Sequence, residues 1–332
     1  MVECNLPNLG SAIALPMAEL RLSSPVEVAG SSQAAATEQP AVSLDSLWQS
    51  YRRSLVARRR APGTVARYEV AIRFWHDYCV TQGWPTAPSE WSRPNLEAYV
   101  VHLLATCAPA TAAGHYRVLR TYCSWLVEEE ELDASPMQRM HAPSVPLTPP
   151  PVVDSDTLER LLTACKGRGL EERRDMAIVL LLASTGMRRG ELVGLRLQDV
   201  DIEQGIATVT GKTGTRVVPL TAAVCVAIDR YMRVRASHRR AALPALLLGH
   251  FGVMTGGGVR QALQRRAAMA GISTRLYPHL LRHSATHAKL AAGMSELDVC
   301  SILGWSSASM LQRYGASMRT ERALASYRRL FA

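Results

Sequence analysis

Hydrophobic residues between positions 43 and 132 recur at the three- and four-residue spacing of amphipathic helices. The first predicted helix covers 43–60, and its apolar face carries Leu44, Leu47, Trp48 and Tyr51. Three more helices follow after short loops, at 64–84, 95–107 and 110–130. Four helices in about 90 residues favour a small bundle, with Thr64 as the N-cap of the second helix. We assign three tryptophans at helical spacing to its core: Trp48, Trp75 and Trp125.

A proline-rich segment, 133–153, follows this helical region. Proline-rich chain is extended and semi-rigid, so we interpret the segment as a linker between two domains. The second domain is expected to begin at Asp154 with a helix whose N-cap is Ser155 or Asp156.

The second region combines helices with one predicted β-hairpin. An apolar helix, 176–184, ends at Gly186, a residue type common just after helix ends. Alternating residues at 206–210 and 216–220 flank a glycine-rich turn, which is typical of a hairpin. Further helices are predicted at 221–238, at 259–270 and from Thr320 to the end. The chain is therefore expected to be mainly α-helical with a small β-sheet.

The composition points to a polyanionic partner. Lys and Arg number 38 against 28 Asp and Glu, a formal net charge of +10, which suits nucleic acid first and a membrane surface second. Seven cysteines, an odd number without a C-x-x-C pair, argue against a disulfide framework or zinc knuckle and for a reducing cytoplasm. No apolar run approaches the length of a transmembrane helix.

Residues 1–43 differ from the rest of the chain. Their only Lys or Arg is Arg21, and Ala, Ser, Pro, Val and Glu dominate. Such a segment lacks the apolar content for a packed core, so we expect it to be disordered. It also lacks the basic start of a secretory signal.

The strongest chemical signal lies in the segment 279–315, HLLRHSATHAKLAAGMSELDVCSILGWSSASMLQRYG. On a helix, His279 and Arg282 share one face because they are three residues apart. A guanidinium offers a fork for phosphate, and a histidine moves protons near neutral pH. Tyr314 could attack phosphorus, but a free phenol has a pKa of about 10 and needs cationic neighbours.

This segment resembles the C-terminal signature of the tyrosine recombinase family, which includes phage integrases and Xer-like recombinases. The family pattern is H-x-x-R, then L-G-H or L-G-W, then the nucleophilic tyrosine nine residues later. Its matching positions here are His279, Arg282, Trp305 and Tyr314. Many members carry histidine where this chain has Trp305, whose indole N–H donates a hydrogen bond but cannot transfer a proton.

The resemblance extends to two further segments. The sequence TGMRRGEL matches the family box that carries the first catalytic arginine, here Arg188, with Glu191 as the acidic residue that braces the site. Lys212 lies in the hairpin turn and matches the family lysine that protonates the leaving 5′ oxygen. Arg189 is interpreted as a surface or DNA-backbone residue.

The resemblance covers about residues 44–332 and implies a fold and an organisation. A SAM-like, four-helix core-binding domain is expected at 44–132, followed by the linker and an α+β catalytic domain at 154–332. Helices that face DNA in the family correspond to those carrying Arg67, Arg117 and Arg120. An arm-binding domain needs a basic footprint, which residues 1–43 lack.

The resemblance also implies a mechanism. Tyr314 would form a 3′-phosphotyrosyl bond that stores the energy of the broken bond, so neither ATP nor a metal is required. Strand exchange would pass through a Holliday junction in a homotetramer on two DNA sites. Three apolar side chains of the last helix would dock on a neighbouring subunit, or alternatively pack on their own domain: Leu324, Tyr327 and Leu330.

The sequence is also compatible with functions other than recombination. A type IB topoisomerase uses the same groups as a monomer, a DNA-binding regulator would need only the basic helices, and a membrane-surface protein would explain only the charge. A phosphate-binding P-loop at GKTGT lacks the upstream glycine. A metal site at His279, His283 and His287 is disfavoured because Arg282 lies between the first two.

Overall fold

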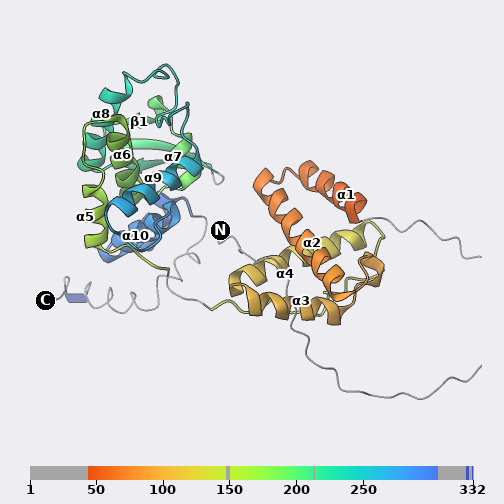
Figure 1. Cartoon of the computed structure of the whole chain (residues 1–332). Coiled ribbons are helices and arrows are strands. Elements are labelled where there is room, and N and C mark those ends of the chain that lie inside the picture. The colour runs from red at the N-terminus through yellow and green to blue at the C-terminus, as the bar shows by residue number, and fades with distance from the viewer. Residues whose placement is uncertain (1–43, 147–149, 212–213, 306–326, 329–330, 332) are drawn as a thin grey trace, which may run out of the picture. The chain divides into compact units, whose positions relative to one another are not determined.

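The structure is a computed structural model that describes residues 44–146, 150–211, 214–305, 327, 328 and 331. The described residues form two compact units, one up to residue 146 and one from residue 150 onward. The division lies inside the proline-rich segment 133–153. Each unit is helical apart from one small sheet in the second, which confirms the predicted fold class (Figure 1).

Four α-helices build the first unit, with a short 3-10 helix between the second and third. The α-helices are α1 (Leu44–Ala57), α2 (Pro62–Gln82), α3 (Arg93–Thr106) and α4 (Pro109–Glu128), and the 3-10 helix is η1 (Pro88–Glu90). Aromatic side chains fill the space between the helices, and six of the most buried are Trp48, Tyr51, Trp75, Tyr99, Tyr122 and Trp125. The three tryptophans predicted for the core are thus buried, at 5%, 0% and 3% exposure.

The start of α2 differs from the prediction. The helix begins at Pro62, with Ala61 as its N-cap, so Thr64 lies inside the first turn. A proline at the first helical position has no N–H to leave unsatisfied, and its fixed φ suits a helix. The proline therefore replaces the side-chain cap that Thr64 was expected to provide.

The chain after α4 folds back onto the first unit before it reaches the division. Met137 and Met140 are buried, and the Tyr116 hydroxyl donates a 2.6 Å hydrogen bond to the Met140 carbonyl. Arg120 bonds the same carbonyl at 3.3 Å. The first eight residues of the proline-rich segment are therefore anchored to α4.

The second unit places helices around a three-stranded antiparallel sheet of order β1-β2-β3. Its helices are α5 (Ser155–Thr163), α6 (Leu170–Thr185), α7 (Arg189–Gly194), η2 (Leu197–Asp199), α8 (Ala222–Arg235), α9 (Gly256–Met269), α10 (Pro278–Ala291) and α11 (Glu296–Leu303). Its strands are β1 (Val200–Asp201), β2 (Ile206–Gly211) and β3 (Gly214–Pro219). The N-cap of α5 is Asp154, whose carboxylate accepts from the Thr157 N–H at 2.7 Å, rather than Ser155 or Asp156.

The predicted hairpin is confirmed as β2 and β3, which pair from Ile206↔Pro219 to Gly211↔Gly214. Alternate residues face the core, and Ala207, Val209 and Val218 are fully buried. β1 was not predicted, because two residues give no periodic signal.

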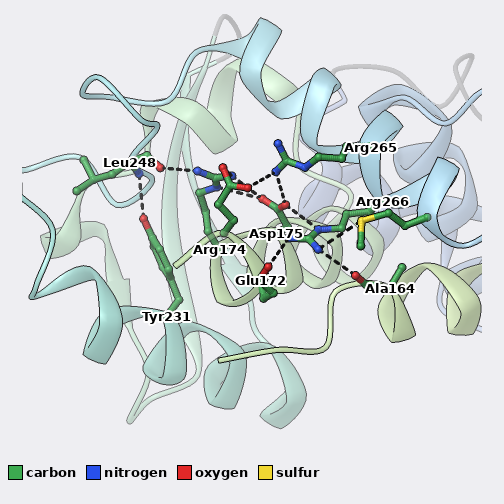
Figure 2. Close-up of polar contacts among 10 residues, drawn as sticks. Ala164, Glu172, Arg174, Asp175, Tyr231, Leu248, Arg265 and Arg266 are labelled. Atoms are coloured by element: carbon green, nitrogen blue, oxygen red, sulfur yellow. Dashed lines mark hydrogen bonds and ion pairs between the residues drawn. The ribbon is translucent and has the colours of Figure 1, made fainter. Parts of the chain in front are cut away.

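α6 runs through the centre of the second unit and carries a buried carboxylate. Asp175 accepts hydrogen bonds from Arg174, Arg265 and Arg266, at 2.9–3.0 Å (Figure 2). Arg174 continues to the Leu248 carbonyl and Arg266 to the Ala164 carbonyl, at 3.2 and 3.1 Å. This cluster bonds α6 to α9 and to two loops.

Candidate active site

The turn between α6 and α7 carries the first predicted arginine. Gly186 follows α6 with a φ of 67°, the left-handed conformation that glycine adopts without strain. A Cβ at this position would lie 2.6 Å from the Leu303 side chain, so the turn can pack closely on α11 only as glycine. Arg188 then stands at the N-cap of α7, and its backbone N–H donates to the Glu191 carboxylate at 2.7 Å.

α10 supplies the second predicted arginine and histidine. Arg282 is 1% exposed, and its Nη1 donates to the Gly186 carbonyl at 2.6 Å. The Trp305 ring centroid lies 5.1 Å from Arg282 Cζ, a distance at which a cation is attracted to the indole face. Arg282 therefore joins the α6–α7 turn to Trp305, the second residue after α11.

Three arginines from separate elements meet at the C-terminal end of α11. Each bonds one of three consecutive carbonyls: Ile302 accepts from Arg216 Nε at 2.7 Å, Leu303 from Arg282 Nη2 at 2.8 Å, and Gly304 from Arg188 Nη2 at 2.9 Å. The last carbonyls of a helix have no partners within it and form the negative end of its dipole, so they attract cations. The end of α11 thus gathers both predicted arginines and adds a third.

Glu191 connects two of these arginines. Its side chain is 1% exposed, and Arg216 donates to both carboxylate oxygens, at 2.9 and 2.8 Å. Arg188 Nη1 donates to Oε1 at 2.8 Å. Burial acts to raise the pKa of this carboxyl, but the hydrogen bonds from Arg216 and Arg188 outweigh it and lower the pKa to about 2.

Arg216 was not singled out from the sequence, although a signal for it was present. Alternation along β3 places Arg216 on the same face as the buried Val218. A charged residue at an inward position needs a buried partner of opposite charge. That partner is Glu191, which is distant in sequence.

His279 is exposed near the start of α10, one turn before Arg282. Partial desolvation of the imidazole by its neighbours, followed by the positive charges of Arg282 and Arg188, lowers the pKa of His279. The imidazole is therefore neutral at pH 7 and can accept a proton. Its ring lies edge to face with that of His283, with centroids 4.8 Å apart.

Lys289, further along α10, was also not predicted to have a role. Its ammonium donates a hydrogen bond to the Ser184 carbonyl in the last turn of α6. Burial, followed by the charge of Arg282, lowers the pKa of Lys289. Together with Arg282, it fixes the end of α6 immediately before the turn that carries Arg188.

Two predicted catalytic residues, Lys212 and Tyr314, lie outside the described residues. The residue before Lys212 is placed, however: a Cβ on Gly211 would lie 2.7 Å from Glu191 Oε1, so the end of β2 packs directly on this carboxylate. Trp305 is half-buried at the end of the described region that precedes Tyr314.

The candidate DNA-binding residues belong to the first unit. Arg67 on α2 and Arg117 on α4 are exposed. Arg120 on α4 is also exposed as a residue, and its Nη1 bonds the Tyr116 hydroxyl at 3.2 Å as well as the Met140 carbonyl.

Two other features are absent from the described part of the chain: a metal site and a membrane-spanning helix. No group of three His, Cys, Asp or Glu side chains there is arranged to hold a metal ion. Within the same residues, every helix is too short or too polar to cross a lipid bilayer.

Comparison with known proteins adds independent information. The model of the phage integrase family matches residues 151–321. The tyrosine recombinase XerC of Halalkalibacterium halodurans is 30% identical over 271 residues, which cover 77% of this chain and 88% of the relative. The tyrosine recombinase XerD of Shewanella oneidensis is 28% identical over 285 residues, covering 82% and 89%.

Solved structures share the fold. The integrase of transposon Tn1549 in complex with transposon right end DNA has a TM-score of 0.70 at 18% identity, over 86% of this chain and 99% of that one. XerH recombinase bound to a palindromic difH substrate has a TM-score of 0.67 at 17% identity, over 84% and 83%. These relatives favour recombination over topoisomerase-like relaxation or DNA binding without catalysis. The chain belongs to the phage integrase family and is a tyrosine-type site-specific recombinase that acts on DNA.

Proposed function

We propose that this recombinase cleaves one DNA strand with Tyr314 and that Arg188 and Arg282 bind the non-bridging oxygens of the phosphate that is attacked. The observation that carries the proposal is the convergence of these two arginines on the neighbouring carbonyls of Gly304 and Leu303. Tyr314 follows Gly304 by ten residues, so the same helix end that gathers the cations leads to the nucleophile.

The proposed first step is a transesterification. The Tyr314 oxygen forms a bond to phosphorus while the bond from phosphorus to the 5′ oxygen breaks. The phenol proton passes to the neutral His279, and Lys212 protonates the departing 5′ oxygen. Trp305 adds an N–H donor and holds Arg282 through its ring face. Positioned donors of this kind contribute roughly 10²–10³ each to the rate.

The second step reverses the first with a different strand. The 5′ hydroxyl of a partner strand attacks the phosphotyrosyl bond and releases Tyr314. Because the covalent intermediate keeps the energy of the original bond, we propose that the reaction needs neither a metal nor ATP. Cleavage that survives excess EDTA without added nucleotide would agree with this, and a requirement for either would contradict it.

The test of the first step uses a DNA site with a nick next to the cleavage position, so that the cut fragment diffuses away and the covalent complex accumulates. We expect a protein–DNA adduct with the native chain and none with Tyr314→Phe. Tyr327→Phe is the matched control, because it removes the hydroxyl of another C-terminal tyrosine, 65% exposed, and keeps its aromatic ring, so it should leave the adduct unchanged. An adduct that persists in Tyr314→Phe would contradict the proposal.

We further propose that the first unit contacts DNA backbone through Arg67, Arg117 and Arg120. All three are exposed on α2 or α4, which supports this assignment. Each phosphate contact releases a counterion, so replacing one arginine by glutamine should reduce the slope of log binding constant against log salt by about 1. An unchanged slope would exclude that residue.

We also propose that four copies assemble on two DNA sites in the cytoplasm and pass through a Holliday junction. A solved lambda integrase tetramer bound to a Holliday junction, similar in fold at a TM-score of 0.64 and 17% identity, motivates this step. In this chain Tyr327 and Phe331 are 65% and 72% exposed, and their rings lie 5.0 Å apart. Tyr327→Ser with Phe331→Ser should abolish the four-protein complex while binding to one site persists. A tetramer that forms unchanged would remove these side chains from the interface.

A further inference from the structure

Arg216 is the third arginine at the end of α11, and its contacts differ from those of Arg188 and Arg282. It donates through two nitrogens to Glu191 and through the third to Ile302. Its side chain is 13% exposed, against 30% for Arg188. Arg216 therefore faces the carboxylate rather than the surface from which a phosphate would approach.

The net charge around Glu191 depends on whether one or two arginines surround it. Glu191 alone with Arg188 would form a neutral pair. Two guanidiniums around one carboxylate leave a net charge of +1. Because Glu191 is buried, the field of its carboxylate is weakly screened and would otherwise oppose an anion bound at Arg188.

We infer that Arg216 is a positioning residue that neutralises Glu191, so that the carboxylate can fix Arg188 in place without cancelling its attraction for the DNA phosphate. This inference rests on the proposed role of Arg188 and adds a residue that acts through it. Arg216 also joins β3 to the end of α11, because it pairs with Val209 in the hairpin and bonds Ile302. The hairpin end at Gly211 packs on the same carboxylate, so Glu191 and Arg216 connect three parts of the site.

The first test varies the charge of the attacked phosphate. Adduct formation is measured on the nicked site with a normal phosphate and with a neutral methylphosphonate at the cleavage position. Arg216→Met should lower the rate about 10²-fold on phosphate, the size of effect typical for loss of one electrostatic contact. On methylphosphonate, which carries no negative charge to be opposed by Glu191, the loss should shrink to about tenfold or less.

Two further variants separate the effect of the Arg216 charge from a general effect on folding. Arg216→Lys retains the positive charge but not the fork, and should lose roughly the same factor on both substrates. Arg216→Gln removes the charge but keeps a donor for the Ile302 carbonyl, and should repeat the substrate dependence of Arg216→Met. Arg265→Met is the matched control, because Arg265 also shares a buried carboxylate with other arginines, and it should behave like the native chain on both substrates.

The second test is a double-mutant cycle. If Arg216 acts through Glu191, Arg216→Met should cost much less in a Glu191→Gln background than in the native one. Equal losses in the two backgrounds, or equal losses on the two substrates, would overturn the inference and leave Arg216 a structural contact of α11. Failure of the proposed function is distinguishable, because then the native chain would form no adduct or Tyr314→Phe would still form one.

Discussion

Two buried carboxylates in the second unit, Asp175 on α6 and Glu191 on α7, have nearly the same chemistry and different surroundings. Each has a side chain that is 1% exposed and accepts hydrogen bonds from several arginines. At Asp175, two of the three arginines are themselves buried, with side chains 5% and 3% exposed, and they end on loop carbonyls (Figure 2). At Glu191, the arginines extend to the end of α11, and Arg188 is 30% exposed.

The same arrangement, a buried carboxylate bonded by several arginines, has different consequences at Asp175 and at Glu191. At Asp175, Arg174 and Arg266 are enclosed and the more exposed Arg265 also pairs with Glu171, so the cluster bonds elements together. At Glu191 part of the positive charge faces outward, so the same bonds can orient a cation for a ligand. Exposure of one arginine does not separate the two clusters, since Arg265 at Asp175 is 43% exposed. What separates them is that the arginines at Glu191 also bond the end of α11.

The largest expected effect is on stability, at the enclosed cluster. Asp175→Asn removes the buried carboxylate that Arg174, Arg265 and Arg266 share. It leaves the three arginines only their ion pairs with Glu171 and Glu172, which are 52% and 34% exposed. We expect the free energy of unfolding to fall by about 3–5 kcal/mol, the cost of breaking a buried ion pair. Urea unfolding measures this loss of free energy. Adduct formation per folded molecule should be unchanged. A loss of activity without a loss of stability would reverse the assignment of the two carboxylates.

Glu191→Gln should reduce activity more than stability, the reverse of the result expected for Asp175→Asn. We expect adduct formation to fall roughly 10²-fold because Arg188 loses the acceptor that orients it. The loss of stability should be smaller than for Asp175→Asn, about 1–3 kcal/mol, because Arg188 and Arg216 are partly exposed to water. Measuring rate and unfolding on the same preparation separates the two effects. Equal profiles for the two variants would remove the distinction between the clusters.

The sequence predicted two members of the cluster around Glu191 and missed the third for a physical reason. Arg188 and Glu191 lie three residues apart at the start of a helix, and a resemblance to a family box identified both. Arg216 meets Glu191 only because the hairpin folds against α7, and a contact between distant residues leaves no local periodicity. Its inward position on β3 was a signal, but it indicated only that some partner must exist.

Helix existence could be predicted more reliably than helix ends. The apolar periodicity of α1 to α4 and of α6 extends over many residues, so small local errors do not hide it. Helix starts depend on single residues: Pro62 moved the start of α2 ahead of Thr64, and Asp154 capped α5 ahead of Ser155. Several residue types can cap a helix, so the pattern left the choice among neighbours open.

Lowering the pH should remove the contribution of Glu191 to the free energy of unfolding. Its folded pKa of about 2 lies below the ordinary value of 4.5, so the carboxylate contributes stability above about pH 4.5. That contribution is lost as pH falls from about 4.5 toward 2. We expect roughly 2 kcal/mol, after allowance for solvent screening around the partly exposed arginines. Urea unfolding of the native chain and Glu191→Gln between pH 6 and 3 should show their difference shrinking. A difference in unfolding free energy that stays constant with pH would mean that the Glu191 carboxylate does not contribute this stability.

A pair of glycines tests whether the end of α11 must stay close to Arg216. Gly304 and Gly83 both end a helix in the left-handed conformation, with φ of 63° and 66°. A Cβ on Gly304 would lie 2.8 Å from Arg216 Nη1, whereas one on Gly83 meets nothing within 4 Å. Both changes to alanine should cost about 1–2 kcal/mol in unfolding free energy from backbone strain. Only Gly304→Ala should also slow adduct formation, and equal activity in the two variants would contradict this.

The smallest expected effect separates two arginines on one carboxylate. Arg265 and Arg266 both bond Asp175 Oδ2 at 2.9 Å, but their side chains are 43% and 3% exposed. Water can replace the exposed partner, so Arg265→Met should lower the unfolding free energy by about 1 kcal/mol or less. Arg266→Met should cost roughly 3 kcal/mol, because the buried carboxylate loses a partner that water cannot reach. Urea unfolding of the two variants isolates the effect of exposure, because both lose an arginine from the same carboxylate oxygen. If they were equally destabilised, exposure would not be what sets the contribution of each arginine at Asp175.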